Sequence, residues 1–305
     1  MDRLPQVNIV ILNWNGLEDT LECLESLRNI NYPNYKIIVV DNHSTGNDVE
    51  LIKEKYENEI SKLIVTEQNL GFSGGNNIGI DYSVESGAEY ILLLNNDTVV
   101  EADFLTILVN EGKSDDIGIV SPMIAYFSDN KKIWSAGGKI NKLKASGFTF
   151  GRNKNVENFN YARICSFASG CCLLIKSRMI KEIGKLDENY FLYLEDTDYC
   201  YRAVKTGYKI LYVGSSKIYH KVHSTTAKKN TLMPLYYSTR NRLYFARKNL
   251  GMIFYISFIY LVVAFTFKWI FVFDEKRATG LIIIRAFGDY FRDRMGQSKY
   301  FQSNG

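Results

Sequence analysis

Short apolar runs alternate with segments of helical periodicity through the first hundred residues of the chain. Four runs have the length and composition of buried strands, at residues 7–12, 37–40, 63–65 and 90–94. Three segments between them are predicted to be helices, at residues 17–29, 49–56 and 71–86. Strands that alternate with helices predict a parallel, doubly wound sheet with right-handed crossovers.

The regular alternation ends near residue 117. The sequence then predicts short, partly antiparallel strands, an apolar strand at 169–175, a helix at 196–205 and a last strand at 210–213. We therefore expect an α/β fold in which a mostly parallel sheet has a small antiparallel portion.

An apolar segment follows at residues 250–273, interrupted only by Lys268. Basic residues flank it, and residues 280–294 then mix Ile, Phe and Arg in an amphipathic manner. The segment is at the lower limit of membrane-spanning length, so we expect residues 246–305 to form a membrane-associating helical tail. The alternative is a packed core helix, and whether the segment spans or lies on a membrane stays open.

The net charge of +4 is unevenly distributed. Residues 240–305 contain 11 Lys and Arg against 4 Asp and Glu, beside the apolar segment. This arrangement favours an anionic membrane surface as partner. Nucleic acid is disfavoured, because the basic residues flank an apolar run and do not form a stripe with exposed stacking aromatics.

Five cysteines occur, and none are in CxxC spacing. Cys171 and Cys172 lie within an apolar run, where buried free thiols are expected. We expect neither disulfides nor a zinc site, and a reducing cytosol fits this pattern. Residues 1–5 show no signal-peptide apolar region.

Acidic residues follow two of the predicted strands. Asp97 comes shortly after the strand at 90–94, where a carboxylate can hold a divalent cation beside phosphates. Asp41 follows the strand at 37–40, where it can accept a hydrogen bond from a base or a ribose hydroxyl. The alternative for each is an ordinary turn residue.

The glycine-rich residues 71–77 open a predicted helix. Glycines let a backbone approach a ligand closely, and the helix would direct N–H groups at an anion. A plain glycine-rich turn is the alternative. The segment does not match GxGxxG, and no complete P-loop is present, so a simple dinucleotide-binding fold has little support.

Three carboxylates lie close together at Glu195, Asp196 and Asp198. Such a cluster raises pKa values or attracts cations, and it suits a proton acceptor. Acidic capping of a helix is the alternative. His220 and His223 follow the last predicted strand, and one histidine with one carboxylate can bind Mn²⁺ or Mg²⁺.

The order of these motifs resembles the family 2 glycosyltransferases with a GT-A fold, and most closely their bacterial rhamnosyltransferase branch. The resemblance covers about residues 7–245. Its motifs lie at residues 9–16, 39–44, 69–79, 93–98, 170–176, 186–202, 207–208, 219–220 and 236–241. It implies a nucleotide-binding half at 1–116 and an acceptor-binding half at 117–245.

The resemblance also implies roles for single residues. Asp41 would hold the base of a nucleotide-sugar, and Arg240 would meet a phosphate of donor or acceptor. The other residues expected to contact the nucleotide-sugar are Asn13, Asn15, Asn69, Gly71, Phe72, Asn77 and Asn96.

The family's metal motif ends at the position of Asp97. The first acidic position of that motif is Asn95 here, so a divalent cation, Mn²⁺ or Mg²⁺, would depend on Asp97 and His220. Asp196 matches the family's catalytic base, and Glu195 would orient the base or the acceptor.

The resemblance implies inverting transfer of a sugar from a nucleoside-diphosphate sugar to a glycan or lipid-diphosphate-linked saccharide, and rhamnose is favoured only by this family likeness. The expected location is the cytoplasmic face of the plasma membrane. Two alternatives remain: a sugar-phosphate nucleotidyltransferase, and a catalytically inactive membrane-bound partner of a glycan-assembly complex. The segment 13–16 lacks the cation that a nucleotidyltransferase loop usually has.

Overall fold

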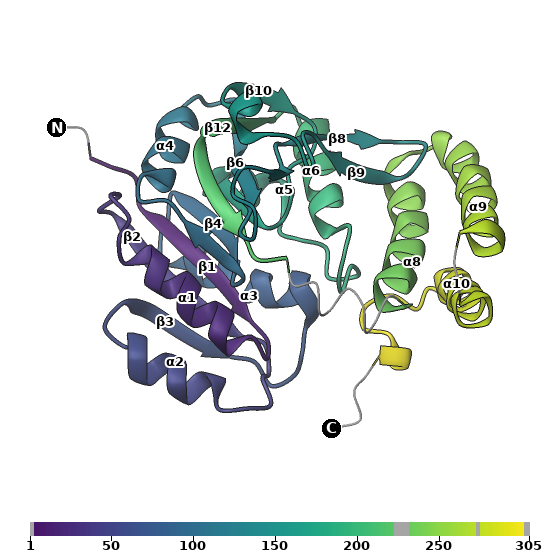
Figure 1. Ribbon diagram of the computed structural model, residues 1–305, viewed down its shortest axis with the longest axis horizontal. Helices are drawn as coiled ribbons and strands as arrows, with labels where there is room; N and C mark the ends of the chain where they lie inside the picture. Colours follow the sequence, from purple (N-terminus) through teal and green to yellow (C-terminus); the bar gives the residue numbers. More distant parts are fainter. Residues whose placement is uncertain (1–2, 223–231, 273–274, 302–305) are drawn as a thin grey trace.

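A mixed sheet forms the centre of the molecule (Figure 1). The computed structural model describes residues 3–222, 232–272 and 275–301, and within them the sheet has ten strands. Eight of these strands lie in the order β10-β12-β6-β11-β4-β1-β2-β3, while β5 pairs with β12 and β7 pairs with β6. The predicted α/β class is confirmed.

The parallel half of the sheet contains the four strands predicted from the apolar runs. They are β1 (Val7–Asn13), β2 (Tyr35–Asp41), β3 (Ile60–Val65) and β4 (Tyr90–Asn95), and β1 lies between β2 and β4. The connecting helices are α1 (Leu17–Leu27), α2 (Asp48–Tyr56) and α3 (Gly71–Glu85). All four strands point the same way, so their carboxyl ends meet at one edge of the sheet.

The second half of the sheet mixes directions. Its strands and helix are β5 (Thr98–Val100), α4 (Phe104–Glu111), β6 (Ile117–Tyr126), β7 (Ile133–Ser135), β10 (Ala162–Cys165), β11 (Cys172–Lys176) and β12 (Lys209–His220). Strand β11 is antiparallel to both β4 and β6. Strand β12 continues well beyond the predicted end at residue 213, because its last residues pair with β5. That pairing sets His220 opposite Thr98.

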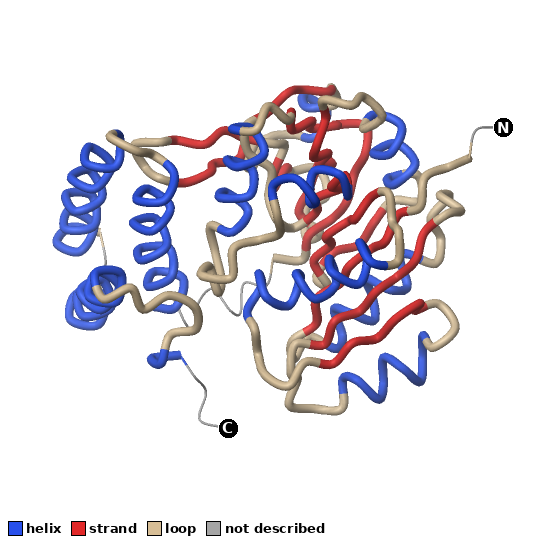
Figure 2. Tube along the Cα trace, turned by 180° about the vertical axis from the view of Figure 1, so that it is seen from behind, coloured by secondary structure: helices blue, strands red, loops and turns tan. Residues whose placement is uncertain are grey.

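Helices cover both faces of the sheet, as the tube in Figure 2 shows from behind. In β1, Ile9 and Ile11 pack toward α1, α2 and α4, whereas Val10 packs toward α3, α5 (Ser177–Ile183) and α6 (Glu195–Lys205). Alternate residues of a strand point to opposite faces, so a strand covered on both sides needs a continuous apolar sequence.

A small hairpin lies apart from the main sheet. It consists of β8 (Gly138–Asn141) and β9 (Ser146–Thr149), and the 3₁₀ helix η1 (Val156–Phe159) follows it. The hairpin extends toward the C-terminal helices in Figure 1.

Three helices form the end of the chain: α8 (Leu232–Asn249), α9 (Ile253–Phe271) and α10 (Lys276–Phe291), followed by the 3₁₀ helix η2 (Lys299–Phe301). The boundary expected at residues 245/246 falls inside α8, so the helical region begins earlier than predicted. Phe273, the last residue of the predicted apolar segment, and residues 302–305 of the tail lie outside the described residues.

Helix α9 is long and apolar enough to cross a membrane, by length and composition alone. Only 17% of its most apolar window is buried, so it is not a core helix. Its inner face packs through Leu261 and Phe265 onto residues of α8 and α10. The outer face remains open.

Asp198, on α6, anchors these helices to the part of the molecule that contains the sheet. It is fully buried and accepts hydrogen bonds from Arg202, Lys248 and Asn249. A buried carboxylate requires such partners. Asp198 therefore joins α6 to the end of α8.

Candidate active site

A hydrogen-bonded chain of side chains connects three strand ends. The amide nitrogen of Asn13, at the end of β1, donates to Asp41 at 2.7 Å and to Asp48 at 2.9 Å. Thr20 donates to the amide oxygen of Asn13 at 2.7 Å, and Asn96, just after β4, donates to Thr20 at 2.9 Å. These bonds fix the strand-end loops relative to one another.

Asp41 lies beneath the surface that was expected to bind the base. It is completely buried, and its oxygens accept from Asn13 and from the N–H and hydroxyl groups of Ser44. It holds the loop 42–45 in place. Its complete burial leaves no exposed carboxylate surface for direct contact with a base.

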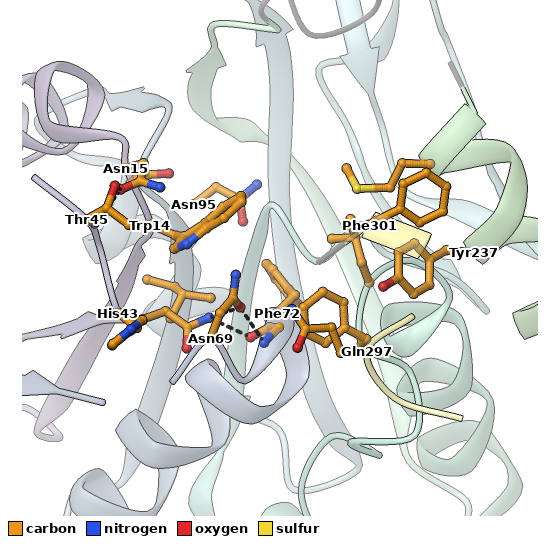
Figure 3. Close-up of a pocket in the computed structure, with 17 residues that line it drawn as sticks. Trp14, Asn15, His43, Thr45, Asn69, Phe72, Asn95, Tyr237, Gln297 and Phe301 are labelled. Carbon is orange, nitrogen blue, oxygen red and sulfur yellow. Dashed lines mark hydrogen bonds between the residues drawn. The ribbon is translucent and has the colours of Figure 1, made fainter. Parts of the chain in front are cut away.

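A cavity of about 560 Å³ opens beside this loop (Figure 3). Five of the residues predicted to bind a nucleotide-sugar line it, namely Asn15, Asn69, Gly71, Phe72 and Asn96. Four neighbours that were not predicted share its wall: Trp14, Asn42, His43 and Thr45. Trp14 is 50% exposed, so its ring is available to a ligand.

Reciprocal amide bonds shape this side of the cavity. Asn15 has φ +50°, accepts from the N–H of Thr45 at 2.8 Å and donates its own N–H to Ser44. Asn42 donates to the side-chain oxygen of Asn69 at 3.0 Å. Asparagine tolerates the left-handed conformation, which explains its use in such tight turns.

The first amides of α3 already have protein acceptors. The N–H of Gly71 donates to Asn69 at 2.8 Å, and that of Phe72 donates to the carbonyl of Phe191 at 2.8 Å. Gly71 has φ +71°, and a Cβ there would lie 2.3 Å from the Phe191 carbonyl oxygen. The expected anion site at this helix end is therefore wrong for these two amides, and the glycine serves a close backbone contact.

Asn77 also has a structural role. It is buried, and its amide donates to the carbonyl of Leu186 and to Glu188 while accepting from the N–H of Leu186. It ties α3 to the loop at residues 186–188. Asn77 is not among the residues that line the cavity.

Arg240 is buried in the helical region. Its guanidinium donates to Asn241 at 3.1 Å and to the carbonyl of Arg294 at 3.2 Å, and it lies over the rings of Tyr236 and Tyr237. Burial lowers the pKa of this guanidinium. Arg240 does not line the cavity, so the phosphate contact expected for it has no support.

The far wall of the cavity comes from the end of the chain. Phe191 stacks on Tyr237 with ring centroids 5.6 Å apart, and Tyr237 lies 6.1 Å from the ring of Phe301. Leu192, Met233 and Gln297 complete this wall. Figure 3 shows Tyr237, Gln297 and Phe301 across the cavity from Trp14 and Asn15. Only the aromatic density of the segment 236–237 hinted at it in the sequence.

Asp97 and His220 meet as predicted. The Nε2 atom of His220 lies 3.0 Å from Oδ2 of Asp97, and the backbone N–H of Lys221 donates to the Asp97 carbonyl. The imidazole packs edge-on against Trp134. His223, the other histidine considered, lies outside the described residues.

These two residues fit a hard divalent cation. Two adjacent ligands about 2.1 Å from an octahedral ion lie about 3.0 Å apart, which matches the Asp97–His220 separation. Among the described residues no group of three His, Cys, Asp or Glu forms a closed metal site. A cation here would thus complete its shell with phosphate and water oxygens.

Asp196 begins the second half of the site. Its Oδ1 accepts from the N–H of Thr197 at 2.6 Å and from the Thr197 hydroxyl at 3.2 Å, while Oδ2 accepts from the N–H of Gly170 at 3.1 Å. Burial raises the pKa of this carboxyl, although these donors partly oppose the rise. A carboxylate with a raised pKa is a stronger base.

Glu195 is buried beside Asp196. Its Oε2 has no hydrogen-bond partner within the described residues, and burial raises the pKa of its carboxyl well above the usual range, with the charge of Asp196 adding to the effect. Glu195 therefore holds a proton more tightly than an exposed glutamate does.

The turn before Glu195 has a strained backbone. Tyr193 and Leu194 have φ of +68° and +73°, a conformation that side-chain-bearing residues rarely adopt. Asn241 on α8 donates to the carbonyls of Leu192 and Tyr193, both at 2.9 Å. No pattern in the sequence predicts this support.

Asp196 and Asp97 lie at the same edge of the sheet. Gly170, which binds Asp196, adjoins Cys171, whose carbonyl accepts from the N–H of Asn95 at 2.9 Å. Asn95 lines the cavity two residues before Asp97. Asp97 and Asp196 do not line the cavity themselves, but they lie behind its wall, next to the lining residues Asn95 and Phe72.

Comparison with known proteins identifies a family. The sequence model of Glycosyl transferase family 2 matches residues 8–184, more than half of the chain. The chain is 25% identical over 225 residues to a low-salt glycan biosynthesis hexosyltransferase of Haloferax volcanii, covering 72% of this chain and 68% of that protein. It is also 25% identical over 248 residues to the dTDP-rhamnosyl transferase RfbF of Shigella flexneri, covering 79% of each.

The fold has solved counterparts. A mannosyltransferase from Pyrobaculum calidifontis, in complex with GDP-Man and Mn²⁺, superimposes with a TM-score of 0.62 over 96% of this chain and 89% of its own. The two sequences are 12% identical, so this likeness concerns the fold.

Proposed function

The chain belongs to glycosyl transferase family 2, and we propose that it transfers a sugar from a nucleoside diphosphate to a lipid-linked saccharide with inversion at the anomeric carbon. The chain is a glycosyltransferase that uses nucleotide-sugars in polysaccharide synthesis, and the family match disfavours a nucleotidyltransferase. The observation that carries the finer proposal is the carboxylate of Asp196, which is anchored by backbone N–H groups and which, like the cavity-lining Phe72, lies against Gly170.

Rhamnose is the proposed sugar. It is supported by the likeness to a dTDP-rhamnosyl transferase over most of both chains.

The nucleoside would bind on the amide-rich side of the cavity. Asn15, Asn42 and Asn69 lie there with their geometry fixed by hydrogen bonds, and the half-exposed Trp14 offers a ring for stacking. The diphosphate would then lie near Asn95 and Asn96, next to Asp97.

Asp97 and His220 would hold the divalent cation. A bound cation supplies charge stabilisation for the leaving diphosphate. The mannosyltransferase of similar fold contains Mn²⁺. The protein's own contribution is to orient these two side chains through the pairing of β5 with β12.

Asp196 would act as the base. The acceptor oxygen forms a bond to the anomeric carbon, the bond from that carbon to the diphosphate oxygen breaks, and the acceptor proton moves to Asp196. One displacement inverts the configuration, and the nucleoside diphosphate leaves with the bonding electron pair. Burial of Asp196 raises its pKa and so strengthens it as an acceptor.

Membrane association would bring the acceptor to this site. The outer face of α9 exposes Tyr255, Ile256, Ile259 and Val263 by more than 60% each. Contiguous apolar surface of this kind marks an interaction site. We place the protein at the cytoplasmic face of the plasma membrane.

Helix α9 would lie on the membrane rather than cross it. The hydroxyl of Ser257 donates to the carbonyls of Lys142 and Leu143, which docks the β8–β9 turn on α9. A spanning orientation would draw the exposed Lys142 and Lys144 toward hydrocarbon, and that is costly. A helix docked along one side suits an interfacial position.

Product analysis tests the proposal. Full-length protein is incubated with Mn²⁺, a panel of nucleotide-sugars including dTDP-rhamnose, and a lipid-diphosphate saccharide acceptor. Acceptor-dependent release of nucleoside diphosphate with an inverted product supports it. Release of pyrophosphate would point to a nucleotidyltransferase, and no turnover with any donor would point to an inactive partner.

A further inference from the structure

Arg242 on α8 has charge that nothing in the described part of the chain neutralises. The described residues give its guanidinium neither a hydrogen bond nor an ion pair, and its Nε atom is buried without a partner. Buried charged groups are nearly always paired, so an unpaired guanidinium calls for a ligand.

Two lysines from other elements belong to the same region. Lys144 lies in the β8–β9 turn and Lys268 near the end of α9. Burial lowers the pKa of Lys268, and the positive charges of Arg242 and Lys144 lower it further, so Lys268 lies within electrostatic range of both other cations. Neither lysine has an ion pair among residues 3–222, 232–272 and 275–301.

Packing holds the three elements together. Ala145, next to Lys144, is fully buried in the same apolar cluster as Leu243 of α8 and Leu261 of α9. The bonds of Ser257 to the β8–β9 turn tie the hairpin to α9 directly. Figure 1 shows the hairpin reaching toward α8 and α9. The three elements that carry the cations are therefore held next to one another by packing and hydrogen bonds.

The same hairpin contacts the catalytic segment. Gly147 donates its N–H to the hydroxyl of Thr197 at 3.2 Å, and Thr197 in turn binds Asp196. Three peptide units separate Lys144 from Gly147, so their Cα atoms lie at most about 11 Å apart. A diphosphate at the cations can thus present an attached sugar to Asp196.

We propose that Lys144, Arg242 and Lys268 bind the diphosphate of a lipid-linked saccharide acceptor. This inference rests on the proposed function. The open face of α9 receives the lipid, the cations hold the diphosphate, and the sugar hydroxyl lies at the base. Guanidinium and ammonium groups are the usual protein partners of phosphate oxygens.

Binding of farnesyl diphosphate to the full-length protein tests this site without requiring turnover. Calorimetry should show roughly tenfold weaker binding for Arg242→Gln and for the Lys144→Gln/Lys268→Gln double variant, in which only exposed side chains change. Arg247→Gln, on the same helix but paired with Asp293, should bind as the unaltered protein does. Unchanged affinity in both test variants overturns the proposal.

Other probes separate the sources of phosphate. Farnesol should bind far more weakly than farnesyl diphosphate, whereas inorganic diphosphate should compete with it. Equal binding of farnesol would overturn recognition of phosphate. Binding to phosphatidylcholine vesicles containing phosphatidylglycerol should be the same for Arg242→Gln and the unaltered protein. If Arg242→Gln instead weakens vesicle binding as much as farnesyl diphosphate binding, the cations bind the anionic lipid surface and the proposal of an acceptor site is overturned.

The two proposals fail in different ways. If Arg242→Gln loses farnesyl diphosphate while no donor supports transfer, the diphosphate site stands and the proposed function fails. If transfer proceeds and the acceptor KM is unchanged in Arg242→Gln, the function stands and the diphosphate site fails.

Discussion

The backbone N–H of Gly170 donates a 3.1 Å hydrogen bond to Oδ2 of Asp196. This bond attaches the first turn of α6 to the segment leading into β11, which lies beside β4. Because backbone N–H groups of Gly170 and Thr197 bind the Asp196 carboxylate, its orientation is well defined, as the proposed role as base requires.

Replacing Asp196 by Asn should abolish transfer and spare donor binding. The amide retains the shape of the carboxylate but accepts no proton, so kcat should fall by about 10²–10⁴. Steady-state kinetics measures the loss, and calorimetry with the nucleoside diphosphate should give an unchanged Kd. Turnover near that of the unaltered enzyme would remove Asp196 from this role.

The Thr197 hydroxyl should set the pH dependence. The base acts deprotonated, so activity declines as pH falls through the raised pKa of Asp196. The hydroxyl donor lowers that pKa, and Thr197→Val should therefore move the acid limb of kcat/KM upward by about one pH unit. Thr197→Ser keeps the donor and serves as control. If the acid limb of kcat/KM in Thr197→Val stays in place or moves to lower pH, Asp196 is not the group that titrates there.

Metal dependence should follow Asp97 and His220. Asp97→Ala or His220→Ala removes one of two protein ligands, so the Mn²⁺ concentration for half-maximal activity should rise at least about tenfold. Asp129→Asn, in an exposed loop, is the control. An unchanged Mn²⁺ titration in both variants would exclude the pair as the cation site.

Asn241 should act as a positioning residue for the base. Asn241→Ala frees two carbonyls and should cost about 1–3 kcal/mol of stability together with a lower kcat at unchanged donor Kd. Tyr193→Gly accepts φ +68° without strain, so adding it should recover part of both losses. If kcat stays unchanged in Asn241→Ala and in the double variant with Tyr193→Gly, Asn241 has a structural role only.

Apolar residues on the outer face of α9 should carry membrane binding. The triple change Ile256→Gln, Ile259→Gln and Val263→Gln should weaken binding to phosphatidylcholine–phosphatidylglycerol vesicles at least about a hundredfold, since each side chain contributes about 1.5 kcal/mol or more. The melting temperature should not fall, because these positions are exposed. Val65→Gln on β3, equally exposed, is the matched control. Flotation with vesicles makes the measurement.

The fold could be predicted because its signals are local. Buried strands such as β4 combine short apolar runs with polar strand ends, and parallel topology follows from alternation with helices. The contact between Asp97 and His220 and the position of Asp196 at the start of α6 were also predictable, because polar strand ends, an acidic helix start and the family resemblance all mark these residues.

The remaining site residues depend on distant contacts. Asn77 and Arg240 are polar residues whose partners are backbone carbonyls elsewhere in the chain, and a sequence pattern does not tell a buried tether from a ligand contact. Phe301 reaches the cavity from more than sixty residues beyond Tyr237. Such closeness arises only after the helices have folded together.

The return of the chain from α10 to the cavity wall has a practical consequence. Gln297 and Phe301 follow the apolar helix pair α9 and α10 in the sequence, yet they line the cavity. Truncating the protein at residue 250 to improve its solubility would remove Gln297 and Phe301 from the cavity wall together with the two apolar helices. A more soluble variant for biochemistry should instead keep the full-length chain and replace exposed apolar residues on the outer face of α9 by polar ones.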